Sequence, residues 1–120
     1  MNDPELDRIH ARYRALQHQV GELGFIAPGS VIERYTLCGT NGCHCHGDPP
    51  VRHGPYFQYT RKVTGKTLTR RLDAEQAQHY RDWIANRRRL DELLTEMDTL
   101  SRQAAELLIT PSTRSPTANT

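Results

Sequence analysis

Apolar residues near the start of the chain recur every three or four positions, which is the spacing of one helical face. The six residues of this stripe are Leu6, Ile9, Tyr13, Leu16, Val20 and Leu23. Their heptad spacing predicts an amphipathic helix. Asp3 is a suitable N-cap with Pro4 in the first turn, and Gly24 followed by Pro28-Gly29 predicts where the helix ends.

A second heptad stripe occupies the last third of the chain. Its members are Trp83, Leu90, Leu93, Met97, Leu100, Ala104 and Leu107. Asp73 and Gln76 have the spacing of a capping box, and no Gly or Pro occurs between Asp73 and Thr110. We therefore expect one helix of about 35 residues, roughly 50 Å long.

Two stripes on either side of a middle segment predict an antiparallel, coiled-coil-like hairpin of helices. The alternative is that each stripe packs separately on the middle segment. Because the second helix is the longer one, we expect its residues after Leu90 to contact a second copy in a homodimer, or another protein.

The middle of the chain changes to β-type sequence. Residues 31–37, 55–63 and 66–72 are rich in β-branched and aromatic residues, and Thr64-Gly65 is a turn signal between the last two. These segments predict a small antiparallel sheet. A sheet of this size needs a packed helix or another clip to be stable.

Three cysteines, Cys38, Cys43 and Cys45, lie within eight residues and are interspersed with histidines. An odd, clustered set of thiols favours metal ligation over disulfides in a reducing compartment. Zinc prefers four nitrogen or sulfur ligands in a tetrahedron. We therefore expect the three thiolates to bind Zn²⁺ together with a histidine. Free or redox-active thiols are the other interpretation.

The fourth ligand can be sought among three histidines. His44 lies between two ligands, and His46 directly follows Cys45, which makes adjacent ligation awkward. His53 lies after a loop that contains Pro49-Pro50, just where the next predicted strand begins, and would close the site, so we predict His53, with His46 or a non-histidine ligand as alternatives. A site filled by four protein ligands is structural, not catalytic.

Charge is unevenly distributed along the chain. Residues 52–89 hold ten Lys or Arg and three Asp or Glu, a net charge of +7 in a chain whose total is +2. This segment indicates an anionic partner, DNA or RNA. The predicted contact residues are Arg61, Lys62, Lys66, Arg70, Arg71, Arg87 and Arg88, with Tyr56, Phe57 and Tyr59 as stacking aromatics. Alternatively, the basic residues only protect an edge strand and the aromatics form core.

Other classes of protein fit less well. The sequence has no Gly-rich phosphate loop, no Ser/His/Asp set and no paired carboxylates, so we do not expect an enzyme. It has no apolar stretch of membrane-spanning length and no signal-peptide pattern at Met1, which favours the cytoplasm and no membrane partner.

Residues 29–108 resemble a group of small, uncharacterised bacterial proteins that are often associated with mobile elements. The shared pattern is a C-G-x3-C-x-C motif, then H-G-P-Y, a basic hairpin and a long helix. The matching residues are Cys38-Gly39, Cys43, Cys45, His53-Gly54-Pro55-Tyr56, Gly65-Lys66 and the helix from Asp73. The resemblance implies zinc binding and a nucleic-acid role. The position of His44 is commonly basic in that group, which favours His53 as ligand.

Together these patterns predict an α+β chain in which a zinc-stapled antiparallel sheet lies between two helices. The predicted segments are 1–28 (heptad helix), 29–72 (zinc knuckle and basic hairpin), 73–109 (long helix) and 110–120 (disordered tail). The first hypothesis is a nucleic-acid-binding accessory protein of a mobile element or phage. The alternative is a zinc-stapled protein–protein adaptor or inhibitor acting through its helical stripe (Leu93, Met97, Leu100 and Leu107).

Overall fold

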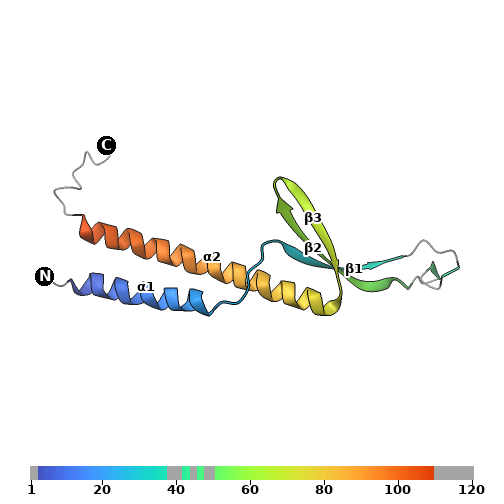
Figure 1. Cartoon of the computed structure of the whole chain (residues 1–120), viewed down its shortest axis with the longest axis horizontal. Helices are drawn as coiled ribbons and strands as arrows, with labels where there is room; N and C mark the ends of the chain where they lie inside the picture. Colours follow the sequence, from blue (N-terminus) through green and yellow to red (C-terminus); the bar gives the residue numbers. More distant parts are fainter. Residues whose placement is uncertain (1–2, 38–41, 44–45, 48–50, 110–120) are drawn as a thin grey trace. The chain divides into compact units, whose positions relative to one another are not determined.

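The chain is α+β, as predicted, with two helices and one three-stranded antiparallel sheet (Figure 1). The computed structural model describes residues 3–37, 42–43, 46–47 and 51–109. The elements are α1 (Pro4–Glu22), β1 (Ser30–Thr36), β2 (His53–Val63), β3 (Lys66–Leu72) and α2 (Ala74–Leu108). Neither helix, within those residues, has an apolar stretch long enough to cross a bilayer. The predicted tail after Ile109 lies outside the described residues.

The chain forms two compact units, and α2 contributes to both of them. The first, the helical unit, contains α1 and the part of α2 from Arg88 onward. The second, the sheet unit, runs from Gly24 to Arg87 and contains the sheet with the first part of α2. Each unit has its own buried cluster of apolar side chains.

Both predicted N-caps are present. The Asp3 carboxylate accepts hydrogen bonds from the backbone N–H groups of Glu5 and Leu6. Asp73 and Gln76 bond reciprocally, each side chain accepting from the other residue's backbone N–H at 2.8 and 3.0 Å. These contacts satisfy donors that the first turn of a helix otherwise leaves unpaired.

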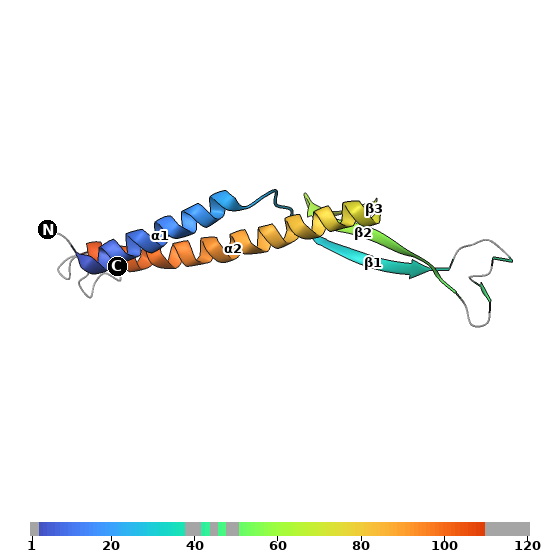
Figure 2. The ribbon, with the colours of Figure 1, turned by 90° about the horizontal axis from the view of Figure 1, so that it is seen from below.

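In the helical unit, α1 packs along the second part of α2 and runs in the opposite direction (Figure 1, Figure 2). The buried residues are Ile9, Leu16, Leu93 and Leu100, all members of the two predicted stripes. Residues of the two stripes thus form one buried cluster, and the coiled-coil-like hairpin stays a prediction. Trp83 is an exception among the stripe residues, because it packs in the sheet unit.

The stripe after Leu90, which was expected to contact a second copy or another protein, is mostly covered within the chain. Leu93 is 1% exposed, Leu100 is 9% exposed, and Met97 packs beside them against α1. Only Leu107, at 37%, remains exposed among the four stripe residues. The antiparallel arrangement is the reason, since it places α1 alongside the end of α2 and not its beginning.

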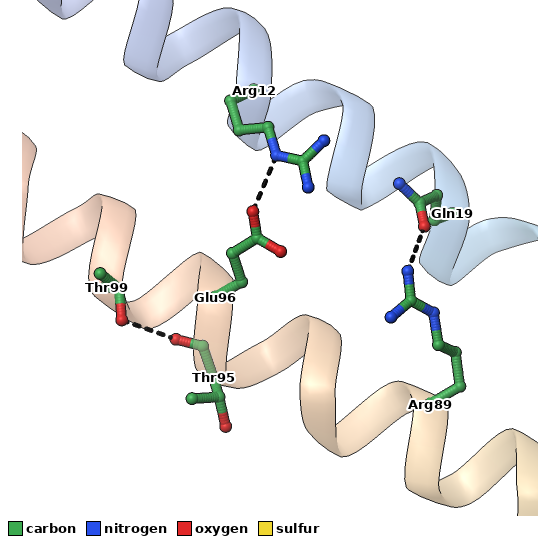
Figure 3. Close-up of polar contacts among 6 residues, drawn as sticks. All are labelled: Arg12, Gln19, Arg89, Thr95, Glu96 and Thr99. Carbon is green, nitrogen blue, oxygen red and sulfur yellow. Dashed lines mark hydrogen bonds and ion pairs between the residues drawn. The ribbon is translucent and has the colours of Figure 1, made fainter.

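Two polar contacts cross between the helices on the exposed side of this unit (Figure 3). Arg12 Nε donates to Glu96 Oε2 at 2.8 Å, and Arg89 donates to the Gln19 side-chain oxygen at 2.7 Å. The hydrogen bond from Arg12 lowers the pKa of Glu96 below its ordinary value. The pair therefore stabilises the helical unit at neutral pH and loses this effect as the pH falls through the lowered pKa. Both side chains are well exposed, so the contribution is small.

The sheet unit is built on β2, which pairs with β1 on one side and β3 on the other. Because strand residues alternate between faces, Phe57 and Tyr59 point to one face together with Leu72. These three pack with Ala27 and with Ala77 and Ile84 from α2 to form the core. The first part of α2 thus covers one face of the sheet.

We predict that Leu93→Ala lowers the free energy of unfolding by about 2–5 kcal/mol, because it opens a cavity between α1 and α2. Leu94→Ala is the matched control: the neighbouring side chain is 48% exposed, and its removal should change stability by less than about 0.5 kcal/mol. Urea unfolding followed by circular dichroism measures both. Equal effects of the two variants would contradict the helix pairing described above.

Candidate metal and nucleic-acid sites

The structure brings together the two predicted zinc ligands that it describes. Cys43 Sγ and His53 Nε2 are 3.2 Å apart in a half-buried position, although ten residues separate them in the sequence. His53 is the first residue of β2 and pairs in register with Thr36 at the end of β1. The strand pairing therefore holds His53 at the end of the sheet from which the cysteine segment begins.

The distance between Cys43 and His53 is close to that between two ligands of one zinc ion. Ligands at about 2.3 Å (sulfur) and about 2.1 Å (nitrogen) from a tetrahedral zinc lie about 3.6 Å from each other. The observed contact is slightly shorter, and it is also the length of a thiol–imidazole hydrogen bond. Cys38 and Cys45 lie outside the described residues. Within the described part of the chain, no three His, Cys, Asp or Glu side chains are grouped to hold a metal.

Gly54, next to His53, occupies a backbone position that suits only glycine. Its φ is +145°, and a Cβ there would lie 2.8 Å from the Arg34 carbonyl oxygen and 2.9 Å from the Tyr35 ring. A side chain would separate β2 from β1 at this end of the sheet. The glycine thus allows the close strand contact that places His53 beside Cys43.

Basic residues of the β2–β3 hairpin lie on both faces of the sheet instead of forming the single cluster that the sequence suggested. Arg61, Lys66 and Arg70 share the face on which α2 packs, whereas Lys62 and Arg71 lie on the opposite, open face. All five are exposed. On α2, Arg87 is half-buried in the sheet unit, and Arg88 is exposed at the start of the helical unit's part of α2.

The predicted stacking aromatics also divide between the two faces. Phe57 and Tyr59 are 8% and 3% exposed and belong to the core, so their predicted role in base stacking is wrong. Tyr59 stacks on Tyr80 with ring centroids 4.2 Å apart, and its hydroxyl donates to the Pro28 carbonyl. Tyr56 is an odd number of positions away from Phe57 and Tyr59 along β2, so its side chain lies on the opposite, open face of the sheet.

Tyr56 lies among polar and basic side chains that sequence reasoning did not group with it. The Arg71 guanidinium carbon is 4.0 Å from the centroid of the Tyr56 ring, and Arg34 pairs in register with Tyr56. Arg34 also donates to the Gln58 side-chain oxygen at 3.3 Å. With Thr36, these residues line a shallow hollow of about 400 Å³. The alternation of side chains along a strand would have assigned Tyr56 and Phe57 to opposite faces of the sheet. The position of Arg34 beside Tyr56 could be known only from the β1–β2 register.

The family model of a domain of unknown function, DUF6788, matches residues 5–82, which include nearly all of α1, the sheet and the start of α2. No curated protein and no solved structure shows significant similarity to the chain. The prediction of an uncharacterised family is confirmed at that level, and the cysteine signature and the link to bacterial mobile elements stay predictions. Because the match covers more than half of the chain, this protein belongs to the DUF6788 family, whose domain has no assigned function.

Proposed function

We propose that this chain is a zinc-stabilised nucleic-acid-binding protein whose β-hairpin contacts phosphates. The observation that carries the proposal is the charge of the hairpin. Residues 53–72 contain five Lys or Arg and no Asp or Glu. All five basic side chains are exposed, and none forms an ion pair within the described residues. A concentration of unpaired positive charge on a rigid ribbon supports binding to a polyanion.

Zinc has a structural role in this proposal. Three thiolates from Cys38, Cys43 and Cys45 and the imidazole of His53 would hold the ion, and bound zinc would crosslink the segment between β1 and β2. The contact between Cys43 and His53 supports this ligand set. With four protein ligands the metal has no open position for substrate. Because such a site forms only in the folded chain, its binding energy contributes to folding of the sheet unit.

Two further parts of the proposal rest on the sequence. The role as an accessory protein of a mobile element or phage follows from the resemblance described above, and homodimer formation would use the end of the α2 stripe at Leu107, which remains exposed. A protein–protein adaptor acting through the stripe of α2 is less favoured. Leu93 and Leu100 are covered by α1 and are not exposed for a partner.

We predict one zinc per chain in protein purified without chelator, and loss of that zinc in Cys43→Ser, with a lower midpoint of thermal unfolding. His46→Ala is the matched control. His46 is exposed and lies near Cys43 in the chain, so its loss should leave zinc content unchanged if His53 is the fourth ligand. Elemental analysis and thermal unfolding by circular dichroism measure these effects. Stoichiometric zinc in Cys43→Ser would contradict the assigned ligand set.

We also predict that Arg61→Ala/Lys66→Ala weakens binding to DNA or RNA and lowers the slope of log K against log salt by about two, because two phosphate contacts are lost. The control variant is Arg8→Ala/Arg14→Ala, which removes the same number of positive charges. Both of its residues are exposed on α1 in the helical unit, so we expect the slope to remain that of the wild type.

A salt series measured by fluorescence anisotropy compares the three proteins. Binding that does not depend on salt, or an equal loss in the control variant, would count against the hairpin as the contact surface.

A further inference from the structure

The open face of the sheet is chemically different from the face that α2 covers. The side chains on the open face, given by strand parity and register, are Ser30, Ile32, Arg34, Tyr56, Gln58, Thr60, Lys62, Thr67, Thr69 and Arg71. None of them is acidic, whereas three are basic and six others carry a hydroxyl or an amide. Among the described residues of the sheet unit, no helix packs on this face.

The positive charges of the open face are not neutralised by the rest of the described chain. Glu33, the one acidic residue of the three strands, lies on the covered face, where it contacts Arg81 and Tyr35. Arg34, Lys62 and Arg71 form no ion pair within the residues that the structure describes. The occupant that this face complements is therefore an anion that extends across all three strands.

Tyr56 lies within this positively charged surface and not in the core. Its ring is flanked by two arginines on neighbouring strands, and Arg71 lies over the ring in a cation–π contact. Gln58, beside it, offers both a donor and an acceptor. Aromatic rings and guanidinium planes are the groups on which proteins stack unpaired bases.

We infer that the open face binds single-stranded nucleic acid, with an unpaired base stacked on the Tyr56–Arg71 pair in the hollow between β1 and β3. Arg34 and Lys62 contact the flanking phosphates, and Gln58 hydrogen-bonds to the edge of the base. The inference rests on the proposed function and specifies the form of nucleic acid and the face that binds it.

Single strands are favoured over a duplex because of where the ring is placed. Tyr56 is near the start of β2, seven residues before the end of that strand and far from the hairpin turn at Thr64-Gly65. A hairpin turn can enter a major groove, but the ring lies in a hollow on the face of the sheet. A base that is paired and stacked within a duplex does not reach such a ring, whereas an unpaired base does.

The test compares a fluorescein-labelled thymidine single strand of about 20 nucleotides with a duplex of the same length, using the full chain. The wild type should bind the single strand more tightly at equal salt. Tyr56→Leu should weaken single-strand binding about tenfold to a hundredfold, the effect of losing one stacked base, with the salt slope unchanged because no charge is lost. Tyr56→Phe keeps the ring and should bind within about twofold of the wild type.

A second pair of variants does not depend on how well Tyr56→Leu folds. Arg34→Gln and Arg81→Gln each remove one exposed charge, the first from the open face and the second from α2, which packs on the covered face. Arg81 is not one of the predicted contact residues, so we expect Arg34→Gln to weaken single-strand binding more than Arg81→Gln does. Equal effects of these two variants would overturn the assignment of the open face.

The remaining outcomes separate this inference from the proposed function. Salt-dependent binding in which the duplex is preferred, or in which folded Tyr56→Leu retains wild-type single-strand affinity, would overturn the inference and leave nucleic-acid binding in place. Absence of binding to both probes would overturn the two together.

Discussion

The sheet unit depends on the packing of one side of β2 against the first part of α2. Tyr59 connects three parts of this unit, because its ring stacks on Tyr80 of α2 and its hydroxyl reaches the carbonyl of Pro28 before β1. Such an aromatic pair adds about 0.5–1.5 kcal/mol to the gain from burial alone. A three-stranded sheet with no helix on it would be marginal, so this contact allows the other face to remain polar.

The segment that connects α1 to β1 is fixed by the same packing. The backbone N–H of Ala27 donates to the Trp83 carbonyl at 3.1 Å, and Asn86 donates to the Phe25 carbonyl at 2.8 Å. Gly29 then passes so close to the Thr60 carbonyl and the Tyr59 ring that a Cβ would clash. These contacts set where β1 begins, and through the β1–β2 register they also set the position of Arg34 on the open face.

Local patterns in the sequence predicted the elements well, because each is determined by neighbouring residues. The heptad stripes, the caps at Asp3 and Asp73 and the turn at Gly65 all lie where they were expected. Long-range relations were less accessible. The partner of the stripe around Leu93 depends on which end of α2 lies beside α1, and the sequence alone favoured a contact of that stripe with a second copy or another protein.

The candidate sites show the same difference between local patterns, which the sequence predicts, and long-range relations, which it does not. His53 could be proposed from the chemistry of zinc and from its place at the start of a strand, and the structure places it beside Cys43. Three aromatic residues within four positions suggested one stacking surface, but the alternation of β2 buries Phe57 and Tyr59 and leaves Tyr56 among the polar residues. Arg34 is distant from Tyr56 in the chain, so only the strand register brings the two together.

The alternation of β2 also has an evolutionary consequence. Core and surface residues occupy separate, interleaved positions of one strand, so a substitution at position 56 or 58 changes the chemistry of the open face without altering the side chains at 57 and 59. The open face can therefore change its chemistry while the core and the fold are maintained. Insertion or deletion of a single residue within β2 would instead exchange the two faces and be selected against.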